Sequence, residues 1–177
     1  MSIMTFYHGS PVADLTELKP SLSEHGKPYI YFARSPLVAL LYAVKPVPKP
    51  FSFYPYGFDG DGNVVYSEYF EDAFKKLYKG KVGYLYECDN LNNIEQPTQI
   101  NCAYTCTENV KIDRVIKISD LYEYFVKRME LGLFKITSSK SAFFWPNTIP
   151  SKELFNIFNI LYVSFLIYDL CPSYMPF

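Results

Sequence analysis

Two short aromatic runs near the start of the chain, separated by turn residues, most restrict what it can fold into. Residues 6–8, Phe-Tyr-His, favour a β-strand, and Gly9 follows at once. Residues 29–33 favour a second strand, in which alternation places Tyr31 and Phe32 on opposite faces. The intervening segment is polar and contains glycine and proline, which break regular structure. The front of the chain therefore predicts two strands rather than a long helix.

The second run leads directly into a predicted helix. Ser35 suits the N-cap position, and Pro36 suits the first helical position because its missing N–H is not needed there. The inward-facing stripe of this helix is expected to consist of Leu37, Leu40, Leu41 and Val44. The result is a strand, turn, strand and helix within 39 residues.

The rest of the chain predicts further short elements. The turn at residues 59–63, Asp-Gly-Asp-Gly-Asn, joins the arms of a hairpin over residues 51–69. Helices are expected over 69–78 and 121–129, the latter with an inward stripe of Leu121, Tyr124, Phe125 and Met129. Strands are expected over 82–88, 103–107 and 110–118. Alternate prolines make residues 45–50 an extended connector.

Composition bounds the class of protein. A chain of 177 residues fits one domain with a small appendage, and a net charge of −1 gives no electrostatic footprint for nucleic acid. The four cysteines lack paired metal-ligand spacing, so we expect free thiols in a reducing compartment. The first residues lack a basic segment and an apolar signal core, which predicts a cytoplasmic protein.

The C-terminal part, residues 136–177, is expected to be a helical extension packed on a domain formed by residues 1–135. Its apolar segment, residues 153–170, has the length of a membrane span, but polar residues interrupt it and no basic flank follows. We therefore predict a buried helix and no membrane partner. The same helix offers aromatic residues for a homo-oligomeric face.

Three pieces of the chain together resemble the ADP-ribosyltransferase superfamily, in particular its His-Tyr-Glu branch. The pieces are residues 7–10 (Tyr-His-Gly-Ser), residues 31–33 (Tyr-Phe-Ala) and residues 39–42. Residues 26–33 are a stretched version of a glycine-lysine-glycine run in the poly(ADP-ribose) polymerases. Residues 82–125 are similar, more loosely, to the second half of rifampin-modifying transferases. The resemblance implies an α+β fold with two small, mostly antiparallel sheets forming a cleft and helices outside.

The resemblance also implies roles for individual residues. His8 would hydrogen-bond the ribose next to nicotinamide, and the main chain of Gly9 would meet the carboxamide. Tyr31 and Tyr42 would sandwich the nicotinamide ring, which suits the stacking preference of aromatic side chains. Further candidate NAD-binding residues within the matched segments are Tyr7, Ser10 and Ala33. Ala39 departs from the pattern, because many polymerases carry a serine there.

Enzymes of this branch also need a carboxylate that holds the ribose and offsets the positive charge of the transition state. The family places it at the start of a late strand, which favours Glu108 as the third catalytic residue beside His8 and Tyr31. The alternatives are Glu87, Asp89 and Glu95. An exposed acid at a strand end, without a catalytic role, explains Glu108 equally well.

The function implied by the resemblance is transfer of ADP-ribose from NAD, used as a substrate, with release of nicotinamide. The acceptor is left open among a protein side chain, a nucleic-acid base and a small molecule. Two alternatives remain: a catalytically inactive module that keeps the fold, and an interaction protein that uses its aromatic surface.

Overall fold

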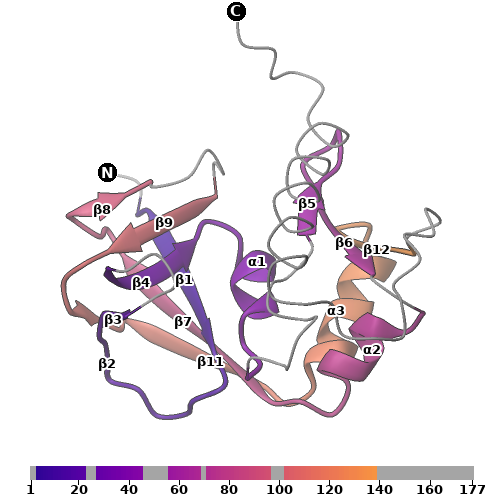
Figure 1. Ribbon diagram of the computed structural model, residues 1–177, viewed down its shortest axis with the longest axis horizontal. Helices are drawn as coiled ribbons and strands as arrows, with labels where there is room; N and C mark the ends of the chain where they lie inside the picture. Colours follow the sequence, from indigo (N-terminus) through magenta and orange to yellow (C-terminus); the bar gives the residue numbers. More distant parts are fainter. Residues whose placement is uncertain (1–2, 23–26, 46–55, 69–70, 97–101, 139–177) are drawn as a thin grey trace, which may run out of the picture. The chain divides into compact units, whose positions relative to one another are not determined.

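The computed structural model describes residues 3–22, 27–45, 56–68, 71–96 and 102–138 (Figure 1). The protein has an α+β fold with mostly antiparallel strands and few helices in the described part. It divides into two compact units, residues 1–46 with 74–128, and residues 47–73 with 129–177. The expected division after residue 135 stays a prediction, because most of residues 136–177 lie outside the described residues. The predicted tail helix and the proline connector lie outside the described residues.

The first unit is built on a seven-stranded sheet. Six strands follow the order β11-β7-β1-β4-β9-β8, and β3 pairs separately with β4 (Figure 1). The strands are β1 (Thr5–Ser10), β3 (Ser21–Leu22), β4 (Pro28–Ala33), β7 (Gly83–Asp89), β8 (Ile94–Glu95), β9 (Ala103–Cys106) and β11 (Arg114–Ile118). The predicted strands at 6–8, 29–33, 82–88 and 103–107 are therefore confirmed.

One face of this sheet carries an apolar core. Phe6 of β1 and the pair Ile30 and Phe32 of β4 are almost fully buried there. Leu18 and Val110 join them from a separate two-stranded sheet, in which β2 (Glu17–Leu18) pairs with β10 (Val110–Lys111). Burial of Ile30 and Phe32 confirms the predicted alternation along residues 29–33.

Helix α1 (Pro36–Leu41) packs on the opposite face, against β1. Ser35 caps it by accepting a hydrogen bond from the amide of Val38, as predicted. A Cβ atom added at Gly9 would lie 1.8 Å from the carbonyl oxygen of Ala39, so glycine permits this close approach of helix and strand. Leu37 is half-buried, whereas Val38 to Leu41 are buried, so the helix is covered on more sides than the predicted stripe.

Two further helices complete the first unit. Phe74 and Tyr78 of α2 (Ala73–Tyr78) pack edge-on against Phe125 of α3 (Leu121–Glu130). The hydroxyl of Tyr78 donates to the carbonyl of Leu41, which ties α2 to the end of α1. Both helices were predicted, but α2 begins at Ala73 rather than at residue 69, since residues 71–72 form a turn. Met129 of α3 is exposed rather than inward-facing.

The second unit contains the predicted hairpin. The strands β5 (Tyr56–Phe58) and β6 (Val64–Glu68) are antiparallel, and β12 (Phe134–Ser138) pairs with β6 in parallel. Asp59 orders the hairpin turn by accepting from the amides of Asp61 and Asn63, and its carboxylate pairs with Lys135 of β12. The hairpin is therefore pinned to a strand far away in the sequence.

The single strand predicted over residues 110–118 is wrong. Residues 110–111 form β10 and pair with β2, whereas β11 starts at Arg114 and pairs with β7. Asp113 marks the break, because its amide donates to the carbonyl of Glu87 and its carboxylate accepts from the amide of Asp89. Among the described residues, the structure contains no helix both long and apolar enough to cross a membrane.

Candidate functional site

Residues 7–10 and 31–33, which carry the resemblance, lie on the neighbouring strands β1 and β4, at the place where the pairing of these two strands ends. Strand β1 pairs with β7 along its whole length, from Thr5 opposite Asp89 to Ser10 opposite Tyr84. Within the described residues, its pairing with β4 consists of one pair, Tyr7 with Ala33. The sheet is thus two well-paired groups of strands, β11-β7-β1 and β4-β9-β8, joined at one position.

The direction of the main-chain groups along β1 follows from two hydrogen bonds. The carbonyl of Met4 accepts from the amide of Asn90 on the β7 side, and the carbonyl of Thr5 accepts from Arg34 on the β4 side. Main-chain groups of successive strand residues point to opposite edges. The N–H and C=O of Gly9 therefore point toward β4, just past the last pair of the two strands.

His8 lies at the same junction. Its Nδ1 is 2.9 Å from the carbonyl oxygen of Tyr31, and since a carbonyl only accepts, Nδ1 carries the proton. Burial lowers the pKa of the imidazole, although the hydrogen bond to Tyr31 acts in the opposite direction. At neutral pH the ring is therefore neutral, with Nε2 as an acceptor. Its ring also contacts the edge of Phe32, 6.1 Å away between centroids.

The two tyrosines predicted to hold nicotinamide are exposed. Tyr31 is 43% exposed on β4, and Tyr42 is 46% exposed at the C-cap of α1. Since Tyr7 and Ala33 are paired, Tyr31 shares the sheet face of α1, whereas His8 and Phe32 share the core face. A ligand that contacts both His8 and Tyr31 must therefore reach from one face of the sheet to the other, at the position where β1 and β4 are no longer paired.

The remaining candidate residues of the matched segments have structural partners. Tyr7 is half-buried and lies between Glu87 and Ala33 in the sheet. Ala33 is buried. Ser10 is also buried, and its hydroxyl accepts from the amide of Val12, so it shapes the start of the following loop.

Two of the four candidate acids belong to a charged cluster on β7, on the opposite side of β1 from β4. The guanidinium of Arg114 donates to Glu87 at 2.6 Å and to both oxygens of Asp89. Asp89 also accepts from the hydroxyl of Thr5, and these bonds, that of Arg114 foremost, lower its pKa. Asp89 lies opposite Thr5 and Glu87 lies opposite Tyr7, on the side of β1 away from β4, so this cluster ties β11 to β7 and stabilises that part of the sheet.

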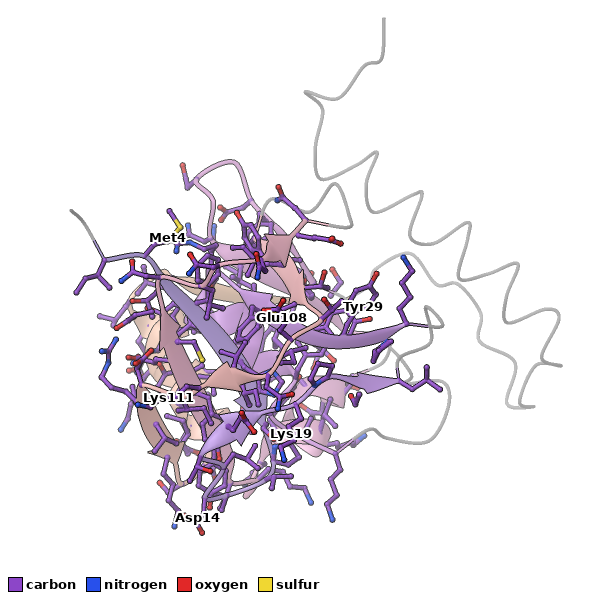
Figure 2. The ribbon with its side chains drawn as sticks, turned by 90° about the vertical axis from the view of Figure 1, so that its left-hand side faces the viewer. Met4, Asp14, Lys19, Tyr29, Glu108 and Lys111 are labelled. Carbon is purple, nitrogen blue, oxygen red and sulfur yellow. The ribbon has the colours of Figure 1, made fainter. Side chains whose placement is uncertain are left out.

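Glu108 and Glu95 lie on the β4-β9-β8 side. Glu108 follows β9 at the end of the sheet toward which β1 and β4 diverge, and its carboxylate accepts from the side-chain amide of Asn93 at 3.1 Å. Glu95 is opposite Thr105, which is opposite Tyr31, so these three share one row and one face. The Cα atom of Glu95 is about 10 Å from that of Tyr31, two strand spacings away. Figure 2 labels Glu108 and also Tyr29, which is near the start of β4 at this same end of the sheet.

One residue near the junction escaped sequence analysis. Thr105 is 2% exposed, and its hydroxyl is the one buried side-chain polar atom of the described residues without a hydrogen-bond partner. Such atoms are uncommon in folded proteins. A lone threonine in a strand is typical of ordinary β-structure, so nothing in the sequence distinguishes it.

Groups of acidic, histidine and cysteine side chains suited to a metal ion are absent from the described residues. Comparison with known proteins gave no match: no family model fits the sequence, and neither curated proteins nor solved structures resemble the chain. Since the comparisons suggest no function, the functional proposal below is argued from the residues at the β1–β4 junction, foremost His8, Gly9 and Tyr31.

Proposed function

We propose that the protein is an ADP-ribosyltransferase of the His-Tyr-Glu type, which uses NAD as a substrate and releases nicotinamide. The observation that carries this proposal is the orientation of Gly9. Its N–H and C=O face the β4 edge where the pairing of β1 and β4 has ended. An amide needs one donor and one acceptor, and this main-chain position supplies both for the carboxamide of nicotinamide.

The surrounding side chains suit the rest of the nicotinamide riboside. Tyr31 and Tyr42 present exposed rings from β4 and α1, on which a flat, electron-poor pyridinium stacks favourably. His8, held by Tyr31, keeps Nε2 as an acceptor for a ribose hydroxyl. The α+β architecture with a sheet that splits at one pair is consistent with the two-sheet cleft of this superfamily.

The reaction needs an anion near the nicotinamide ribose. The bond between ribose C1′ and the pyridinium nitrogen breaks, and nicotinamide leaves with the electron pair. The oxocarbenium-like carbon then bonds the acceptor nucleophile, which loses its proton. A carboxylate aimed at this charge is worth about 10²–10³ in rate. Glu108, oriented by Asn93, is the proposed residue, and Glu95 is the alternative.

The second candidate function is a binding module that holds NAD without turnover. The observation that favours it is the distribution of acids, since Glu87 and Asp89 are engaged by Arg114 and Glu95 is two strands from Tyr31. Ala39, buried against Gly9, also lacks the hydroxyl that many polymerases place there. The module and the enzyme share the site and differ in the chemical step.

Two measurements test the proposal and separate these functions: calorimetric titration with NAD and release of nicotinamide. We expect His8→Ala and Tyr31→Ala each to reduce release at least about tenfold, since each loses a hydrogen bond or a stacking partner. Val115→Ala, an exposed position on β11, is the control and should release nicotinamide at the unmodified rate. NAD binding without release supports the module, whereas absence of binding at millimolar NAD rejects both functions.

A further inference from the structure

The loop after β1, residues 11–16, is fixed to the sheet by the hydroxyl of Tyr86. This hydroxyl donates to the carbonyl of Val12 at 2.7 Å and accepts from the amide of Leu15 at 3.3 Å. The amide of Val12 is held in turn by Ser10. Asp14, between the two attachment points, has a positive φ of 57°. A single buried oxygen atom thus holds both sides of the loop.

Tyr86 is directly opposite His8 in the register of β1 and β7. Opposed residues of neighbouring strands project to the same face of a sheet, with Cβ atoms about 5 Å apart. The loop that Tyr86 holds therefore lies over the face from which the His8 side chain projects. Burial of Tyr86 is complete, and burial raises the pKa of its hydroxyl, so the hydroxyl keeps its proton and can donate to Val12.

We propose that Tyr86 is a positioning residue that holds loop 11–16 beside His8 as one wall of the ligand site. This inference rests on the proposed NAD-binding function of His8. Tyr86 does not touch the substrate, but its hydroxyl sets the place of the main chain from Val12 to Leu15. A ligand bound at His8 on this face meets that main chain. Loss of the hydroxyl should therefore weaken ligand binding and leave the bond-breaking step unchanged.

The test compares Tyr86→Phe with Tyr84→Phe in the full chain. Both changes remove one hydroxyl from β7 on the same face, and the two rings stack with centroids 6.4 Å apart. Within the described residues, the hydroxyl of Tyr86 and not that of Tyr84 bonds this loop, so Tyr84 is a matched control. Tyr86→Phe should raise KM for NAD about fivefold, the worth of a typical hydrogen bond, with kcat within about twofold of the unmodified protein. Tyr84→Phe should change neither constant.

Ser10→Ala is a second variant that loosens the same loop from its other attachment, and it should give the same rise in KM. It keeps the test decisive if Tyr86→Phe does not fold. The amide of Leu15 should also exchange faster with solvent in Tyr86→Phe, because it loses its acceptor. Faster exchange with an unchanged KM would overturn the proposal, and so would a fall in kcat at constant KM.

Failure of the underlying function is visible separately. If the unmodified protein neither binds NAD nor releases nicotinamide, the proposed function fails before any variant is compared. The imidazole resonances of His8 in the unliganded protein then decide whether Tyr86 positions the loop. A shift of these resonances in Tyr86→Phe, absent in Tyr84→Phe, supports the positioning role, and identical resonances in all three proteins reject it.

Discussion

His8 donates from Nδ1 to the carbonyl oxygen of Tyr31 across 2.9 Å, although their side chains project from opposite faces of the sheet. The bond spans the junction of β1 and β4 at the point where regular pairing has ended. It links a strand of one well-paired group to a strand of the other. It also fixes which imidazole nitrogen remains available to a ligand.

The protonation of His8 provides the first prediction. Nitrogen NMR of the labelled imidazole should show the tautomer with the proton on Nδ1, and a titration should give a pKa below 6.5 because burial disfavours the charged ring. The chain contains two histidines, so His8→Gln assigns the resonances. A proton on Nε2, or a pKa above 6.5, contradicts the assigned hydrogen bond.

Gly9→Ala should destabilise the protein strongly. The added methyl group would lie 1.8 Å from the carbonyl oxygen of Ala39, so α1 must move away from β1. Overpacking of this kind costs about 3 kcal/mol of the free energy of unfolding, which urea denaturation of the full chain can measure. Gly60→Ala is the control, since nothing lies within 4 Å of a Cβ at that position. Equal midpoints for the two variants would show that the helix does not pack as described.

The catalytic acid can be assigned by two amide substitutions. Glu108→Gln should reduce nicotinamide release about 10²-fold, because the neutral amide cannot offset the charge of the transition state. Glu95→Gln, on the strand next to β9, should reduce it much less. NAD affinity should stay within a few-fold in both. The reverse ranking would transfer the role to Glu95, and full activity in both variants would exclude both acids.

The ion pair of Asp59 with Lys135 should make the second unit sensitive to acid. Lys135 foremost, and then the amide of Asn63, lowers the pKa of Asp59 from 3.8 to about 2. A lowered pKa stabilises the folded state above the unfolded value, and this stability is lost as pH falls from about 4 to 2. Asp59→Asn should weaken that part of the pH dependence of unfolding. Identical acid profiles for Asp59→Asn and the unmodified chain would rule out the ion pair as a contributor.

The sequence predicted those helices, turns and strands that are marked by caps, turn residues or alternation within a few neighbouring positions. Ser35 with Pro36 marked the start of α1, and the Asp59–Asn63 turn marked the hairpin. Alternation placed Ile30 and Phe32 in the core. In each case the pattern that predicted the element lies within a few neighbouring residues of the sequence.

Partner choice between distant strands was not predictable from such signals. Residues 110–118 alternate like one strand, but their two ends pair with β2 and β7. β12 was not anticipated, since it is defined by parallel pairing with β6, some 70 positions earlier. The single pair between β1 and β4 likewise depends on where each strand meets its other neighbour. The sequence therefore allowed the candidate site residues to be named, but it did not predict that His8 and Tyr31 lie on opposite faces of the sheet.

A structure determined with NAD, or with nicotinamide alone, tests the central claim most directly. The account predicts the carboxamide at the N–H and C=O of Gly9, the ring against Tyr31 and Tyr42, and a ribose hydroxyl at Nε2 of His8. A ligand bound elsewhere on the chain, or regular hydrogen bonds between β1 and β4 past Tyr7 and Ala33 that occupy Gly9, would contradict it.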